Sequence, residues 1–273
     1  MPTQVGNLVV FGDIELKWLA IGGLSSPLRQ PVTNEAPTFD DVGREQKFQG
    51  GFISWHPDVA VKAHVVWGLI GERWAAIGRE KFGYPVTDES DFPGGGKYNT
   101  FRAMQLAGHP EASIVWKPGT TAAWEVYGAI RDKWISVGSV SGALGYPVQE
   151  ERSLNDGGGR FQLFEGGSIS WHPGTDAHVE VRHPAISLRA VADQGQFIVV
   201  EGTGFTSNQP VILGYDIASG GAPTTHQTGQ DTLTSDGTGR FVHRIRVNLA
   251  GDISSAQVQA TDIASNMKAT ASI

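Results

Sequence analysis

Three short stretches of the chain share one pattern of apolar positions. The pattern falls at Ile14, Trp18 and Ile21, at Ile70, Trp74 and Ile77, and at Ile130, Trp134 and Val137. The spacing i, i+4, i+7 places three side chains on one face of a short helix. The copies lie 56 and then 60 residues apart, and such a period is typical of one supersecondary unit repeated in tandem. We therefore predict three repeat units that bury their apolar faces against each other.

The segments around each helix repeat as well. Glycines begin and end the helix at Gly12 and Gly22 and at the matching positions of the other copies, where the second glycine predicts a left-handed C-cap. The helix is followed by a Pro-Val turn, a glycine with a basic residue after it, a phenylalanine, and an apolar run that ends in Trp-x-Pro. The run FQLFEGGSISW alternates around a Gly-Gly bend and predicts a β-hairpin. We expect repeats at about 12–67, 68–127 and 128–183, each a short helix plus a hairpin. Closure into a propeller-like ring with pseudo-threefold symmetry is one arrangement that three such units allow.

These motifs resemble those of a known family. The phrases FGYPVTDE, LGYPVQEE and GGGRFQLFEGGSISWHPGTDAH, alternating with VYGAIRDKW, are similar to the LGFP repeats of actinobacterial cell-envelope proteins. The resemblance covers residues 6–183 and implies an extracellular, non-catalytic module, often joined to mycoloyltransferases or cell-wall hydrolases, that holds its partner on cell-wall polysaccharide. The first repeat departs from the pattern at Arg29 and Gln30, where the others have Gly-Tyr, and the second carries an insertion of about eight residues after Phe101.

The pattern changes after Pro184. Residues 184–273 contain no tryptophan, and roughly seven short alternating segments are separated by Gly-rich turns. In FVHRIRVN, Phe241 and Ile245 share one face while Arg244 and Arg246 share the other. This spacing predicts an immunoglobulin-like β-sandwich as a second domain. The predicted fold class is thus mostly β with short helices.

Composition narrows the choice of partners. The net charge of −7 and the pI near 5.6 argue against nucleic acid as the main partner. No apolar stretch is long enough to span a membrane, and there is no cysteine for a disulfide, thiol nucleophile or thiolate site.

The first residues do not form a signal peptide. The resemblance implies the cell envelope, and the absence of a visible signal also leaves the cytoplasm open. The sequence does not indicate an oligomeric state.

Aromatic residues are the first candidates for ligand binding, since an indole ring offers apolar area and a hydrogen-bond donor to a sugar. Six of the eight tryptophans occupy positions repeated in every copy, and we assign them to packing: Trp18, Trp55, Trp74, Trp116, Trp134 and Trp171. Trp67 and Trp124 break the repeat pattern, which makes them candidate ligand contacts. Tyr84 and Tyr146, beside the turn prolines, are further candidates, with turn packing as the alternative.

Charged residues recur too. Glu35, Glu89 and Glu151 each follow a polar or acidic neighbour. Paired carboxylates can serve a glycoside hydrolase, but a pair that recurs after a Pro turn is more simply a structural element. The glutamates can instead accept hydrogen bonds from sugar hydroxyls, together with the basic residues of the repeats, Arg44, Lys97 and Arg160.

Histidines raise the question of a metal site. His64 matches His178 across repeats, and His172 and His183 lie near His178. Imidazole suits zinc, yet the spacing matches no zinc motif. Solvent-facing or hydrogen-bonded histidines are the better interpretation, with His64 and His178 as candidate ligand contacts. We expect no metal and no cofactor.

These observations favour a non-catalytic protein that binds a polysaccharide. One alternative is a protein-interaction module of a phage or secretion assembly, in which Trp67 and Trp124 would be interface residues. The other is a glycoside hydrolase that uses the repeated carboxylates.

Overall fold

The computed structural model describes residues 2–154, 157–192, 196–206, 208–221, 223–263 and 267–273. The chain forms two compact units. The N-terminal unit holds residues up to 163 together with 169–179, and the C-terminal unit holds 164–168 and 180–273. The change of composition after Pro184 thus lies close to the division between the units.

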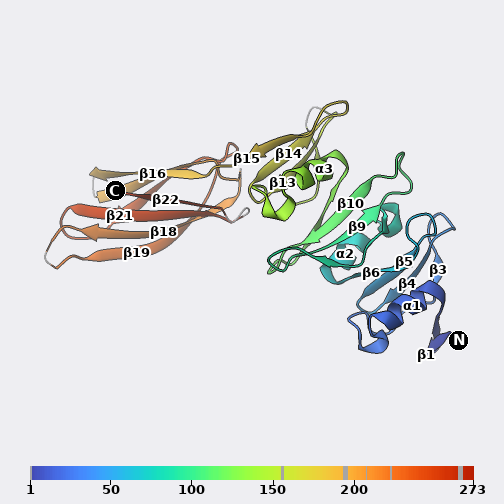
Figure 1. Cartoon of the computed structure of the whole chain (residues 1–273). Coiled ribbons are helices and arrows are strands. Elements are labelled where there is room, and N and C mark those ends of the chain that lie inside the picture. The colour runs from blue at the N-terminus through green and yellow to red at the C-terminus, as the bar shows by residue number, and fades with distance from the viewer. Residues whose placement is uncertain (1, 155–156, 193–195, 207, 222, 264–266) are drawn as a thin grey trace. The chain divides into compact units, whose positions relative to one another are not determined.

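The three predicted repeats make up most of the N-terminal unit (Figure 1), and residues 164–168 and 180–183 of the third repeat are assigned to the C-terminal unit. Each begins with a nine-residue helix followed by a single 3-10 turn. The helices are α1 (Gly12–Ala20), α2 (Gly68–Ala76) and α3 (Gly128–Ser136), and the 3-10 turns are η1 (Gly23–Ser25), η2 (Arg79–Lys81) and η3 (Ser139–Ser141). Gly22, Gly78 and Gly138 end the helices in the left-handed region, with φ of 109°, 108° and 103°, which confirms the predicted C-caps.

An antiparallel sheet completes each repeat, and it is larger than the predicted hairpin. The first repeat has the order β3-β4-β5-β6, the second β11-β10-β9-β7 with β8 also on β9, and the third β12-β13-β14-β15. The strands are β3 (Ala36–Pro37), β4 (Arg44–Phe48), β5 (Gly51–Trp55), β6 (His64–Trp67), β7 (Tyr84–Pro85), β8 (Ser90–Asp91), β9 (Lys97–Arg102), β10 (Glu111–Trp116), β11 (Ala123–Tyr127), β12 (Arg152–Ser153), β13 (Arg160–Phe164), β14 (Gly167–Trp171) and β15 (His178–Val181). A short hairpin of β1 (Thr3–Val5) and β2 (Leu8–Val10) precedes α1.

The helix tryptophans form the cores of the repeats, as the sequence predicts. Trp18, Trp74 and Trp134 are at most 2% exposed. Each indole N–H donates to a carbonyl of the following turn, that of Arg29 (2.9 Å), Gly83 (3.0 Å) or Gly145 (2.9 Å). Packing and a satisfied donor therefore fix the helix against its turn in every copy. The strand-end tryptophans Trp55, Trp116 and Trp171 are only half-buried.

A buried amide joins the sheet of each repeat to the strand before its helix, and in the second and third repeats that strand belongs to the preceding sheet. Gln46, Asn99 and Gln162 are fully buried, and each side-chain nitrogen donates to two carbonyls. One acceptor lies in the turn of the same repeat and the other in the strand before its helix, at Val9, Val65 or Glu125. In the described part of the chain the three sheets stay separate and are joined in sequence order. The propeller-like ring is therefore a wrong expectation, because these links connect each repeat to the strand just before it.

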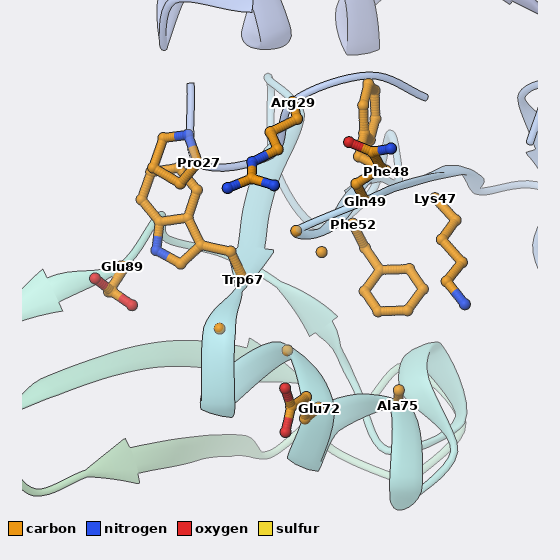
Figure 2. A pocket seen from close by; sticks show the side chains of 14 residues that line it. Pro27, Arg29, Lys47, Phe48, Gln49, Phe52, Trp67, Glu72, Ala75 and Glu89 are labelled. Carbon is orange, nitrogen blue, oxygen red and sulfur yellow. The ribbon is translucent and has the colours of Figure 1, made fainter. Parts of the chain in front are cut away.

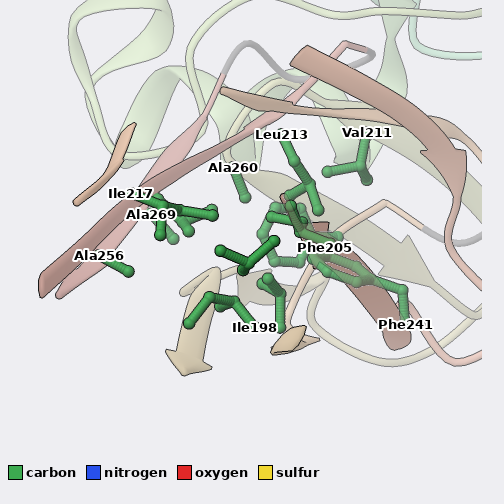
Figure 3. Packing of buried hydrophobic residues seen from close by; sticks show 13 residues of the cluster. Ile198, Phe205, Val211, Leu213, Ile217, Phe241, Ala256, Ala260 and Ala269 are labelled. Carbon is green, nitrogen blue, oxygen red and sulfur yellow. The ribbon is translucent and has the colours of Figure 1, made fainter. Parts of the chain in front are cut away.

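The C-terminal unit contains two antiparallel sheets around a common core. The described strands give the orders β16-β17-β20 and β19-β18-β21-β22. They are β16 (Ala185–Ala192), β17 (Gln196–Thr203), β18 (Pro210–Ser219), β19 (His226–Thr234), β20 (Phe241–Val247), β21 (Ile253–Asp262) and β22 (Lys268–Ser272). Figure 3 shows Ile198 and Phe241 from one sheet meeting Leu213, Ile217 and Ala256 from the other. The alternation predicted for β20 is confirmed, since Phe241 and Ile245 are buried while Arg244 and Arg246 are exposed.

None of the helices described in either unit is both long and apolar enough to cross a membrane.

Candidate functional site

A groove of about 650 Å³ lies where the first repeat meets the second. Its first-repeat wall comprises the turn at Pro27 and Arg29 and the β4–β5 turn, while the N-terminal part of α2 forms the other wall. Figure 2 shows Trp67 beside Pro27, with Glu89 beyond the indole and Phe52 on the opposite side. The groove thus combines aromatic surface with side chains of both charges, namely Arg29, Lys47, Glu72 and Glu89.

Trp67 occupies the helix N-cap, and this corrects the view that it breaks the repeat pattern. Phe11 and Tyr127 hold the same position before α1 and α3. This equivalence can be read from the sequence, because each aromatic residue directly precedes the glycine that begins a helix. One part of the half-buried indole packs on the core of the first repeat, and another part lines the groove. The N-cap position is therefore aromatic in all three repeats, and the choice of tryptophan is particular to this repeat.

The structure brings together the repeated glutamates and basic residues. Glu35 lies 3.8 Å from Arg44, Glu89 lies 3.9 Å from Lys97, and Glu151 lies 2.5 Å from Arg160. In the second and third repeats the polar group of the N-cap aromatic residue favours the ionised form of the carboxyl group: Trp67 acts on Glu89, and Tyr127 acts on Glu151. The same three-part cluster of N-cap ring, carboxylate and cation thus forms twice.

Burial governs the ionisation of these carboxyl groups. Desolvation raises the pKa of Glu35, Glu89 and Glu151 above the ordinary value, although the cation beside each acid opposes this rise. The residues just before two of these glutamates turn to other partners: Asp88 contacts Lys17 and His64, and Glu150 contacts Arg73. The two acids of each pair therefore have different partners. The second acid contacts the basic residue of its own repeat, and the first contacts the helix of the preceding repeat.

Trp124 lies on β11 under an arginine. The Arg73 guanidinium carbon is 5.1 Å from the centroid of the indole ring, within the range of a cation–π contact. Arg73 also donates two hydrogen bonds to Glu125, of 2.6 and 2.7 Å, and one to Glu150 of 3.0 Å. The half-buried Trp124 is thus part of an ion-pair network between the second and third repeats.

The two candidate tyrosines pack between repeats. Tyr84 is fully buried, and its hydroxyl contacts Asp40 at 2.7 Å and Thr38 at 2.6 Å in the first repeat. Tyr84 therefore does not line a ligand surface, and turn packing accounts for it. Tyr146 is half-buried and fits against Gly96, where a Cβ atom would come within 2.1 Å of its hydroxyl. Each tyrosine needs a glycine in the preceding repeat, which for Tyr84 is Gly43.

The candidate histidines lie in different environments. His64 is half-buried, and its Nδ1 is 3.2 Å from Asp88. Burial opposes ionisation of Asp88, but hydrogen bonds from His64, Lys17 and the Val65 amide outweigh it and hold the pKa of Asp88 well below its usual range. His178 is exposed on β15. Among the described residues, no group of three or more His, Asp or Glu is placed to hold a metal ion.

A second groove of about 390 Å³ occupies the equivalent place after the second repeat. Tyr127 and Gly128 stand where Trp67 and Gly68 line the first groove. The insertion predicted from the sequence builds one wall, through Ala103, Gln105, Leu106 and Pro110. The two grooves therefore differ because the insertion covers only the second.

The architecture defines a tandem array of small helix-and-sheet repeats followed by a β-sandwich. The LGFP repeat model matches residues 29–81, 82–142 and 144–187, together more than half of the chain, so the protein belongs to the LGFP repeat family. The family frame starts at the turn after each helix, later than the frame proposed from the tryptophan pattern. The comparison with curated proteins finds no match.

Proposed function

We propose that this protein binds cell-wall polysaccharide without catalysing a reaction, and that it acts in the cell envelope. The observation that carries the proposal is the groove at the first repeat junction, with Trp67 and Phe52 on its walls. Sugar rings have apolar faces and polar edges, so aromatic surface bordered by hydrogen-bonding groups is suited to them. Membership of the LGFP family supports the cell envelope as the place of action.

The charges around this groove favour a neutral polymer there. Arg29 and Lys47 are matched in number by Glu72 and Glu89. Carboxylates accept from hydroxyl groups, and guanidinium and ammonium groups donate to them. Glu89 lines the groove together with Trp67 and lies 3.9 Å from Lys97, so its carboxylate can accept from a ligand hydroxyl. A groove with balanced charge offers no net attraction to a charged polymer, so neutral, hydroxyl-rich chains fit it best.

A protein-interaction module is the second candidate, and one observation favours it. Leu16, Leu19 and Leu24 in and just after α1 are 67%, 51% and 59% exposed. Glutamate and aspartate stand at the position of Leu16 in α2 and α3. Exposed leucines clustered in one repeat are the kind of surface that a protein partner covers.

We further propose that the C-terminal sandwich is of the immunoglobulin type. Its seven described strands form sheets of three and four strands in which β17 pairs with β20 and β18 pairs with β21. These pairings join strands distant in sequence, as Greek-key connections do. A sandwich of this kind serves as a spacer or adhesion module, and the fold alone does not choose between them.

The test is binding of the full chain to insoluble, delipidated actinobacterial cell walls, measured by co-sedimentation. Trp67→Ala should weaken binding roughly tenfold or more, which corresponds to about 1.4 kcal/mol. Phe11→Ala is the matched control, because Phe11 holds the same N-cap position but does not line the groove. Equal binding by both variants, with unchanged melting temperatures, would exclude the groove as the site. Absence of binding to any polysaccharide, with association through the α1 leucines, would favour the protein-interaction module.

A further inference from the structure

We propose that the outer face of the sheet β16-β17-β20 is a second binding site, one that takes a polysaccharide bearing carboxylate groups. Alternation along β17 turns Ile198 and Val200 into the core, so Phe197 and Val199 face outward. The register aligns nine outward positions in three rows, which are Val191, Phe197 and Arg246, then Arg189, Val199 and Arg244, then Ser187, Glu201 and Val242. Three of these positions are arginine and one is acidic.

The arginines make this face positive on an acidic chain. The whole protein has a net charge of −7, whereas the nine positions carry three positive charges and one negative charge. Glu201 lies 3.5 Å from Arg189. Among the described residues no acidic side chain pairs in this way with Arg244 or Arg246, and both arginines are exposed. Their charges are therefore available to an external anion.

Apolar side chains hold the arginines in place. The Arg244 guanidinium carbon lies 4.4 Å from the centroid of the Phe197 ring, so the cation stacks on the ring while its N–H groups remain free to bind. Val199 faces outward yet is only 3% exposed. Its cross-strand neighbours are Arg189 and Arg244, whose aliphatic stems can cover it. Positioned cations lose less side-chain entropy on binding than free ones.

The spacing favours a polymer over a single ion. Residues two apart on a strand are separated by about 7 Å, and neighbouring strands by about 4.8 Å. Arg244 and Arg246 are thus about 7 Å apart along β20, and Arg189 lies two strands, about 10 Å, from Arg244. A chain of sugar units spans such distances, and a guanidinium group binds carboxylate with two parallel hydrogen bonds. Phe197 and the 70% exposed Val242 lie among them, which offers apolar contact to sugar rings. A uronic-acid chain combines both features. This site is separate from the groove at Trp67 and does not depend on the function proposed for that groove.

The experiment measures binding of the full chain to fluorescent polygalacturonate at about 50 mM salt, where screening is weak. The variant Arg244→Gln with Arg246→Gln should bind about tenfold more weakly. The matched control, Lys62→Gln with Lys268→Gln, removes the same charge from exposed positions elsewhere and should stay within about twofold of the parent. Trp67→Ala should also leave this binding unchanged, so failure here and failure of the groove are distinguishable. Melting temperatures establish that each variant is folded.

Three results would overturn the proposal. The first is equal weakening by the two charge-matched double variants, which would mean that net charge alone acts. The second is no binding of polygalacturonate above the level of neutral dextran. The third is binding of poly-L-glutamate that depends on Arg244 and Arg246 without comparable binding of polygalacturonate, which would assign the face to an acidic polypeptide.

Discussion

The two junctions between repeats use the same backbone but different chemistry at their centres. In the first junction Glu80, only 4% exposed, accepts a 2.9 Å hydrogen bond from Ser54 and lies beside Glu45. At the matching positions the second junction has Val140, Val115 and Tyr98. The residues at the centre of a junction can therefore differ between repeats. The buried amide and the contact between tyrosine and glycine are common to both junctions and fix how the repeats meet.

One position of the helix also differs between the two junctions. Gly71 of α2 lines the first groove and packs closely on the Val66 carbonyl. Its counterpart in α3 is Arg131, which is 8% exposed and donates to Ser113 at 2.9 Å and to Glu111 at 3.1 Å. The first junction thus has a closely packed glycine that lines the groove, where the second has a buried arginine that is hydrogen-bonded to the preceding sheet.

The largest expected effect tests what the junctions share. Trp74→Ala and Trp134→Ala should each lower the free energy of unfolding by about 3 to 5 kcal/mol, since each removes a fully buried ring and its hydrogen bond. Chemical denaturation measures both. A loss below about 1 kcal/mol for either variant would mean that its repeat does not depend on this core.

The next expected effect is a pH dependence of the free energy of unfolding that arises in the first junction and not in the second. Burial and the neighbouring Glu45 raise the pKa of Glu80 to about 7. An acid whose pKa is higher in the folded state binds more protons when folded, so the free energy of unfolding should fall as the pH rises from about 4.5 to about 7. The fall is on the order of 3 kcal/mol. Glu80→Gln should flatten the profile between these pH values, and a profile that keeps its slope in this variant would place the responsible group elsewhere.

A smaller effect tests the tyrosine contact. Tyr84→Phe should lower the free energy of unfolding by about 1 to 3 kcal/mol, because it leaves buried Thr38 and the nearby carboxylate of Asp40 without their hydroxyl partner. Urea denaturation gives the value. Phe39→Leu is a suitable control, since Phe39 also stacks on Tyr84 but is 44% exposed. A Tyr84→Phe protein as stable as the parent would show that the hydrogen bonds contribute nothing at this junction.

The smallest expected losses of stability come from two ion pairs at equivalent helix positions. Arg73→Ala removes bonds to Glu125 and Glu150 and the contact with Trp124, and should cost about 2 kcal/mol. Lys17→Ala removes one contact, of 2.7 Å, to a carboxylate side chain that is 40% exposed, and should cost at most about 1 kcal/mol. Thermal denaturation at low and high salt resolves the two. The reverse order would contradict the greater burial of the Arg73 network.

The sequence by itself determined the repeat, its helices and the residues of its cores. The spacing of Ile14, Trp18 and Ile21 reflects the period of a helix, and glycines mark its ends. The recurrence of Glu89 and Lys97 was visible in the sequence, whereas their contact of 3.9 Å is seen only in the structure. Alternation in the last 90 or so residues likewise predicted strands and assigned Arg244 to an outward face. These features are local, and local periodicity carries them.

Only the tertiary structure decided how the repeats meet and which side chains remain accessible. Tyr84 is buried because Gly43, 41 positions earlier, leaves room for its ring. Trp67 lines a groove because the first-repeat turn at Pro27 and Arg29 and the helix α2 come together around it. Neither contact has a periodic signature, since each joins side chains that the chain brings together only after separate elements have packed. The sequence therefore predicted the repeating elements, and long-range packing determined the surfaces between them.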